Sequence, residues 1–271
     1  MFDFVNYTYS GVLSILSCLF GMSYPLVIGC IEKIDSRFHS TQLTERFLRE
    51  SSFKMFKLML VINLISAVVS PFFMDGNTHS RIILGVQCSL AVLMVVYAFL
   101  LFSRIISYYN VERLHELIIK DYNHAVNYGN KDVEALCFTE WVDITPELLF
   151  SADDKLAQKV YEVLADYIAR KYQERKEKEC EYDQYFYDGI SRINETLCKG
   201  DRKPISINNG NSILTSLIFQ DSGVSETSYR YLWRNLRTQL YYGKDEWIME
   251  YWKIASQKYG LFRECRFIQR N

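Results

Sequence analysis

The chain has 271 residues and a formal net charge of −1, with 31 Lys and Arg against 32 Asp and Glu. A charge this close to neutral provides no overall attraction to nucleic acid, so we expect no nucleic-acid partner. The charges are unevenly spread, because almost all long uncharged runs precede Ser103. We therefore predict a membrane domain over residues 1–103 and a helical domain over residues 104–271.

Three uncharged segments lie in the first part, at residues 11–31, 58–74 and 82–102, and each is rich in Leu, Ile, Val and Phe. Helices of these lengths rise about 25 to 31 Å, which is about the thickness of the hydrocarbon core of a bilayer. A soluble core able to bury all three would be larger than this chain can form. The pattern therefore predicts three transmembrane helices. The first is not typical of a cleavable signal peptide, because the residues before it include Asp3 and no Lys or Arg.

The connections between the segments indicate the orientation. The second connection, residues 75–81, carries only Arg81 as a basic residue, whereas the first carries Lys33, Arg37, Arg46, Arg49, Lys54 and Lys57. Because short basic loops stay in the cytoplasm, we predict an outside N-terminus, a cytoplasmic domain 104–271 and a location in the cell (inner) membrane. The aromatic residues expected at the outer interface are Phe2, Phe4, Tyr7, Tyr9, Phe72 and Phe73, and those at the inner one are Tyr108 and Tyr109.

The segments next to the spans have helical patterns of their own. Residues 36–57 place Leu43, Phe47 and Leu48 on one side of a helix. We predict that this amphipathic helix lies along the inner leaflet and runs into the second span. The third span has no Gly or Pro stop, so its helix is predicted to continue to Tyr128 as a stalk.

The remaining residues also predict helices. Gly129 and Asn130 break the stalk, and Thr145-Pro146 and Ser151 are typical helix starts. Apolar residues near every fourth position predict one long helix to about Cys198, with the charged stretch 170–183 in its middle. After loops at 199–204 and 208–211, we predict helices at 212–219, 225–242 and 244–259, the last two ended by Gly243 and Gly260. The fold class is therefore all-α, with three transmembrane helices followed by a cytoplasmic helical domain.

The residue patterns typical of enzymes and metal sites are absent. The four His residues are scattered, the seven Cys residues lack zinc-ligand spacing, and no nucleophile-elbow or nucleotide-binding glycine motif occurs. We expect free thiols, no metal, no cofactor, no catalytic residue and no enzymatic activity. A pocket with convergent acids of strongly shifted pKa would reopen the enzyme hypothesis.

The spans carry few polar groups. They contain no Asp, Glu, Lys, Arg or His, which disfavours an ion-coupled transporter. One face of the first span instead carries a small or kinking residue at every fourth position: Ser17, Gly21, Pro25 and Gly29. Such a face lets another helix approach closely, and we favour packing within the three-helix bundle over lining a pore in an oligomer. Asn63 and Gln87 should find partners across helices or subunits.

An aromatic and basic run lies at residues 229–237. At helical spacing it predicts one apolar stripe, formed by Tyr229, Leu232, Trp233, Leu236 and Leu240, with Trp247, Tyr251 and Trp252 packed against it. Base stacking is disfavoured because the surrounding domain is slightly acidic. We interpret Arg230, Trp233, Arg234 and Arg237 as candidates for a cytoplasmic interaction.

These patterns favour a non-enzymatic, membrane-anchored interaction or signalling module. Its partners would be the lipid bilayer and a cytoplasmic protein or a second copy of the chain. The alternative is an oligomeric channel or membrane-permeabilising effector, which the small-residue face and the two amides in the spans would serve.

Overall fold

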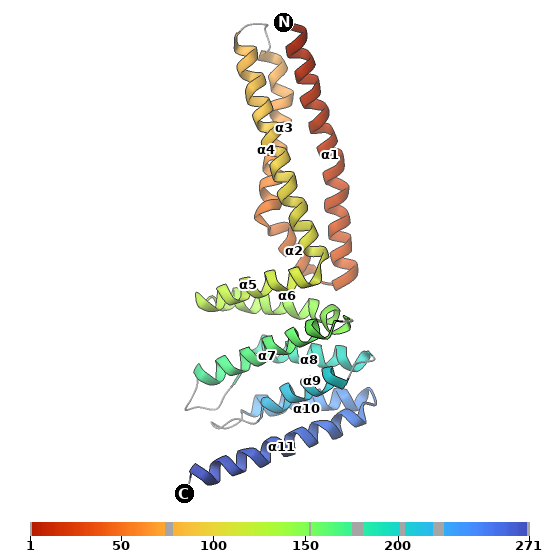
Figure 1. The fold of residues 1–271 in the computed structure, drawn as a ribbon, viewed down its shortest axis with the longest axis vertical. Coiled ribbons are helices and arrows are strands. Elements are labelled where there is room, and N and C mark those ends of the chain that lie inside the picture. Colours follow the sequence, from red (N-terminus) through yellow and green to blue (C-terminus); the bar gives the residue numbers. More distant parts are fainter. Residues whose placement is uncertain are drawn as a thin grey trace. The chain divides into compact units, whose positions relative to one another are not determined.

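The computed structural model describes residues 2–73, 78–151, 153–174, 181–200, 204–218 and 225–269, and these residues contain helices and no strand (Figure 1). The predicted all-α class is confirmed. The chain divides into two compact units, an N-terminal unit, Met1–Leu114, and a C-terminal unit, His115–Asn271.

The N-terminal unit is built on three long apolar helices, α1 (Phe2–Phe38), α3 (Ser51–Val69) and α4 (Thr78–Tyr109). The helix α4 packs against both α1 and α3 (Figure 1). The three stretches Ser10–Phe38, Ser51–Val69 and Ile82–Tyr109 are long and apolar enough to cross a membrane. This confirms the three apolar helices predicted from hydropathy. Most of their side chains face outward, as expected where lipid rather than protein is the solvent.

The predicted end of the second span, at about Met74, lies outside the described residues. The helix α3 ends at Val69 and gives way to a 3₁₀ turn, η1 (Ser70–Phe73). Pro71 lies in that turn, and a proline cannot donate the backbone hydrogen bond that would continue an α-helix. The next residues, 74–77, and the side chains of Phe2, Phe4, Tyr7, Tyr9, Phe73 and Arg81 lie outside the description.

The helix α2 (Thr41–Arg49) is amphipathic as predicted, but it does not run into the second span. Leu43 and Phe47 are fully buried, whereas Leu48 is exposed. Glu50 separates α2 from α3, with a ψ of 135° that is not helical. The break lets Phe47 pack edge-on against Tyr108 of α4, with ring centroids 5.2 Å apart. Tyr108, predicted to lie at the inner interface, is therefore buried in the bundle.

The predicted continuous stalk is also wrong, because α4 ends at Tyr109 and α5 (Val111–Asn127) begins two residues later. Asn110 lies between them, and its side-chain oxygen accepts a hydrogen bond of 3.1 Å from the backbone N–H of Arg113. An asparagine at a helix start satisfies a backbone donor that would otherwise lack a partner. Hydropathy periodicity continues across this residue and does not reveal the interruption.

The C-terminal unit continues with six helices: α6 (Lys131–Phe150), α7 (Asp154–Glu174), α8 (Gln184–Lys199), α9 (Pro204–Ser216), α10 (Glu226–Tyr241) and α11 (Asp245–Gln269). They form layers, because α6 packs on α7 and α8, these pack on α9 and α10, and α11 packs on the last two (Figure 1). Each layer thus contacts its neighbours in chain order. The helix α11 is the outermost layer at one end.

The predicted single helix to Cys198 is two helices. Glu181–Asp183 are not helical, and residues 175–180 lie outside the description. Tyr167 of α7 stacks on Phe186 of α8 with ring centroids 4.0 Å apart. In one continuous helix these residues would be about 28 Å apart along the axis. Aromatic packing between the two halves therefore replaces the predicted long helix.

Three further predicted boundaries differ from the structure. The helix α6 runs through Pro146, because the hydroxyl of Thr145 donates a hydrogen bond of 2.7 Å to the carbonyl of Val142, the acceptor that proline leaves without a backbone donor. The predicted turn at 208–211 lies inside α9, and α11 continues through Gly260. Other boundaries are confirmed. Gly129 and Gly243 adopt positive φ values of 67° and 65° at the predicted helix ends.

Candidate functional site

A buried polar network connects α5, α6, α7 and α8 of the C-terminal unit. Glu134 is only 2% exposed. One of its carboxylate oxygens accepts hydrogen bonds from Arg170 at 3.1 Å and from the hydroxyl of Tyr185 at 2.9 Å. The other accepts one from Lys131 at 3.1 Å. The carboxylate therefore has cationic and neutral donors that compensate for its loss of water.

A second pair extends this network. Lys171 is buried and donates to Asp183 at 2.9 Å. The hydroxyl of Tyr167 donates to the same carboxylate at 2.7 Å. Burial alone would raise the pKa of Asp183, but the hydrogen bonds from Lys171 and Tyr167 lower it below its usual value. Burial raises the pKa of Tyr122 to about 12 and also raises that of Tyr167.

These pKa shifts keep each group in its ordinary charge state at neutral pH, the carboxyl of Asp183 ionised and the phenols neutral. A proton-transfer site needs the opposite, with groups brought close to the working pH. The network is therefore suited to holding four helices together rather than to acid–base chemistry. Sequence reasoning missed it because its residues come from helices separated by loops.

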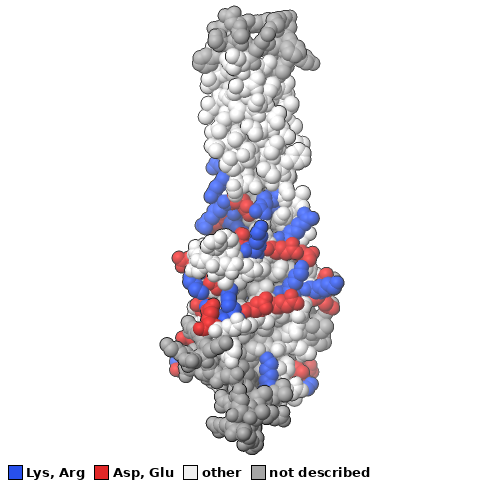
Figure 2. Space-filling model, turned by 60° about the vertical axis from the view of Figure 1, so that its left-hand side comes forward, with Lys and Arg blue, Asp and Glu red and all other residues white. Residues whose placement is uncertain are grey.

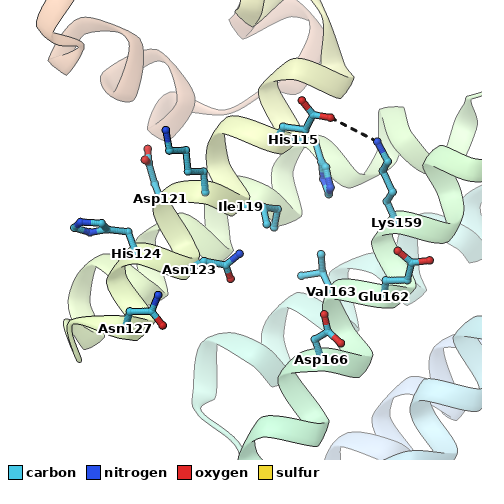
Figure 3. A pocket seen from close by; sticks show the side chains of 12 residues that line it. His115, Ile119, Asp121, Asn123, His124, Asn127, Lys159, Glu162, Val163 and Asp166 are labelled. Atoms are coloured by element: carbon cyan, nitrogen blue, oxygen red, sulfur yellow. Dashed lines mark ion pairs between the residues drawn. The ribbon is translucent and has the colours of Figure 1, made fainter.

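The described residues of the same unit line two hollows. One, with a volume of about 810 Å³, lies between α5 and α7, and an ion pair of 3.8 Å joins Glu116 to Lys159 across it (Figure 3). Near its end, His115 accepts a hydrogen bond of 3.1 Å from the indole of the fully buried Trp141. The other, of about 690 Å³, lies between α6 and α8 beside the buried network.

The lining of the first hollow is mostly charged or amide groups, and Ile119 and Val163 are the apolar residues that line it (Figure 3). Small-molecule sites are usually lined by apolar side chains with a few polar groups. Among the described residues, no group of three or more His, Cys, Asp or Glu side chains is placed to hold a metal ion. Cys18, Cys30, Cys88, Cys137 and Cys198 are free thiols, and the side chains of Cys180 and Cys265 lie outside the description.

The candidate residues in the spans occupy two different places. Asn63 of α3 donates to the carbonyl of Leu90 of α4 at 3.3 Å, and Ser66 of α3 donates to the side-chain oxygen of Gln87 of α4. Both amides are thus buried between α3 and α4. By contrast, Ser17, Gly21 and Pro25 of α1 are exposed.

The face of α1 that carries these small residues is open. A Cβ atom added at Gly21 or Gly29 would meet no atom within 4 Å. Neither glycine is therefore needed for close packing inside one chain, which disagrees with the favoured interpretation of packing within the bundle. Lipid or a second chain can lie directly against this face.

The helix α10 presents two different faces. Leu232 and Leu236 are buried, and so are the polar residues Ser228, Asn235 and Gln239. The amide of Gln239 donates to Asn194 of α8 at 3.0 Å and to Asn211 of α9 at 3.3 Å. Buried amides thus join three helices. The predicted single apolar stripe is wrong. The buried face of α10 combines the leucines with these amides, and Tyr229, Trp233 and Leu240 are exposed.

We call the exposed side chains at this end of the unit the α10–α11 surface, and define it as Tyr229, Trp233, Leu240, Met249, Trp252 and Tyr259. Trp233 is 58% exposed and Trp252 is 49% exposed, with ring centroids 6.4 Å apart. Met249, Trp252 and Tyr259 recur at spacings of three and seven along α11, so they lie on one side of that helix. Tyr251 and Ala255 are buried on its other side.

The predicted interaction residues belong to this surface or flank it. Trp233 is part of it, and Arg230, Arg234 and Arg237 are exposed along one edge of α10. Arg230 pairs with Glu226 of the same helix at 2.6 Å, and the guanidinium of Arg234 lies 5.8 Å from the ring of Tyr231. No other described residue pairs with Arg237. The surface therefore combines exposed aromatic rings with positive charge available to a partner.

No protein-family model, no curated protein and no solved structure matches this chain. The arguments for function therefore depend on the chain's own residues.

Proposed function

We propose that this protein is a non-enzymatic, membrane-anchored interaction module. In this proposal α1, α3 and α4 hold it in the cell (inner) membrane, the C-terminal unit lies in the cytoplasm, and the α10–α11 surface binds a protein partner. The observation that supports the proposal most strongly is the exposed aromatic surface on the outermost layer of the helical stack.

The outer layer of a helical stack normally needs a polar outer face to remain soluble. The helix α11 instead has apolar residues on both sides, with Tyr251 buried and Trp252 exposed. Exposed contiguous apolar surface on a folded unit marks a site of protein or membrane interaction. Trp, Tyr and Arg are also the residue types that contribute most to the binding energy of interfaces.

The positive edge of α10 indicates the chemistry of the partner. An apolar helix with carboxylates on one side would cover the rings of Trp233 and Trp252 and reach Arg237. Such an arrangement combines hydrophobic burial with charge complementarity, which sets partner choice and orientation. We propose a helical, acidic segment of a cytoplasmic protein as the occupant.

The proposal is tested by site-specific photo-crosslinking in cells that express the full chain. A photoreactive residue replacing Leu240, which is 61% exposed, should give a discrete protein adduct. The same residue replacing Tyr128, which is 76% exposed in the turn after α5, is the matched control and should give none. Adding Trp233→Ala should remove the adduct at position 240.

Equal labelling at positions 240 and 128, or an adduct that persists in the Trp233→Ala variant, would contradict the proposal. An adduct with the mass of two chains would identify a second copy, rather than another protein, as the partner.

A second candidate function is an oligomeric channel or membrane-permeabilising effector. The exposed face of α1 at Gly21 favours it, since a Cβ atom there would meet no atom within 4 Å and another chain could approach closely. The test is ion flux through liposomes that contain the purified protein, with Gly21→Leu as the variant. Absence of flux, together with an unchanged cellular effect of Gly21→Leu, would exclude this function.

A further inference from the structure

Seven basic residues of the N-terminal unit gather at one end of its helix bundle. They come from α1, α2, α3 and α4, and we call them the basic collar: Lys33, Arg37, Arg46, Arg49, Lys54, Lys57 and Arg104. Figure 2 shows that positive side chains begin where the uncharged surface of the bundle ends. Each helix that is apolar enough to span a membrane therefore carries basic groups at the same end.

Part of this charge is neutralised within the unit. Arg49 pairs with Glu45 at 2.8 Å, and Arg104 pairs with Glu50 at 3.3 Å. The backbone carbonyl of Tyr109 accepts a hydrogen bond of 3.0 Å from Arg37. These groups have partners in the protein itself.

Three lysines of the collar are different. Lys33, Lys54 and Lys57 are exposed, and no carboxylate among the described residues pairs with them. The ammonium group of Lys33 lies 5.8 Å from the centre of the Tyr109 ring. Lys54 and Lys57 lie one turn apart near the start of α3. Their charges are thus available to a ligand from outside the protein.

The location of these lysines indicates which chemical class of ligand they bind. They lie at the end of helices whose exposed side chains are apolar, and when these helices cross a bilayer that end lies where lipid headgroups meet the hydrocarbon core. A lysine there extends its aliphatic stem along the apolar surface and places its ammonium group among the headgroups. The exposed Tyr109 beside Lys33 is typical of the same interfacial level.

We propose that the basic collar binds the headgroups of anionic phospholipids and concentrates these lipids around the N-terminal unit. In an anionic headgroup the phosphate carries a net negative charge that can pair with an unpaired lysine. In a zwitterionic headgroup the lipid's own cationic group already neutralises the phosphate. Basic residues close to a bilayer surface each favour anionic lipid by about 1 kcal/mol. This proposal is independent of the α10–α11 surface and requires no protein partner.

The proposal is tested by electron paramagnetic resonance on the full chain in phosphatidylcholine vesicles, with spin-labelled phosphatidylglycerol or phosphatidylcholine as the probe. The motionally restricted fraction of each probe gives its relative association with the protein. The unaltered protein should prefer phosphatidylglycerol by about fivefold. The preference should fall close to one in the variant Lys33→Gln, Lys54→Gln, Lys57→Gln, and should persist in the corresponding triple Lys→Arg variant.

The matched control removes three lysines from the C-terminal unit, as Lys120→Gln, Lys155→Gln, Lys253→Gln, and should keep the preference. If the control loses as much preference as the collar variant, total charge rather than the collar is responsible and the proposal is wrong. Salt provides a test without any substitution. The proposal is wrong if the unaltered protein shows no preference for phosphatidylglycerol. It is also wrong if that preference does not weaken at high ionic strength.

Discussion

The buried network around Glu134 makes a quantitative prediction about stability. In the variant Glu134→Ala, Arg170 and Lys131 lose the carboxylate that they share, and the hydroxyl of Tyr185 loses its closest acceptor. The change is confined to α6 and the helices around it. It therefore measures how far the network stabilises the C-terminal unit.

The size of the effect follows from the exposure of the partners. Removing one member of a buried ion pair costs about 3 to 5 kcal/mol. The side chain of Arg170 is 26% exposed and that of Lys131 is 60% exposed, so water can solvate part of both cations. We therefore expect a loss of about 2 to 3 kcal/mol in the free energy of unfolding. For a unit of this size the loss lowers Tm by about 5 to 10 °C.

The assay is thermal unfolding of the purified full chain in mild detergent, followed by the fluorescence of the fully buried Trp141. Glu226→Ala is the matched control, because Glu226 pairs with Arg230 on the surface of α10, where both side chains are largely exposed. The control should cost less than about 0.5 kcal/mol. If Glu134→Ala is no more destabilising than this control, the network does not stabilise the unit as argued.

Three further variants test other parts of the account. Gly189→Ala should destabilise the C-terminal unit by about 1 to 3 kcal/mol in chemical unfolding, because the new Cβ would lie 2.6 Å from the ring of Phe138; unchanged stability would show that α6 and α8 are packed less closely. Because the pKa of Asp183 is lowered on folding, its stabilisation is fully present above the unfolded pKa of about 4 and is lost as pH falls from there through the lower pKa of the folded state. Acid titration should therefore destabilise the unaltered unit more than Asp183→Asn, and identical pH profiles would contradict this. Pro146→Ala should raise Tm by a few degrees, since alanine is favoured over proline inside a helix; a lower Tm would mean that the proline ring contributes packing there.

The sequence was most informative where one physical effect dominates. The length of the uncharged segments was sufficient to predict three apolar helices, because lipid leaves few other arrangements of the backbone. Gly129 and Gly243 were correctly predicted as helix ends because their positive φ values favour glycine.

Predictions failed where a tertiary contact overrides a local pattern. Thr145 supplies the hydrogen bond that lets α6 continue through Pro146, and the stacking of Tyr167 on Phe186 joins two helices that periodicity had merged. Neither contact can be inferred from spacing along the chain.

The candidate surface was predicted in part. Trp233 and the three arginines of α10 are exposed, but their run was expected to hide its aromatic residues in one stripe. The buried amides of Asn235 and Gln239 explain the difference, because they bond to α8 and α9 and turn the other face of α10 outward. Polar residues on a helix are usually predicted to face water. The sequence alone therefore does not indicate that these amides are buried in a network.

The most direct test of the account concerns the arrangement of the chain in the membrane. A tag placed after Asn271 is probed with a membrane-impermeant reagent in intact and in permeabilised cells, after alkaline extraction of the membranes. We predict that the protein stays in the membrane pellet and that the tag reacts only after permeabilisation. A protein released by alkaline extraction, or a tag that reacts in intact cells, would contradict the claim that three apolar helices span the bilayer with the C-terminal unit inside.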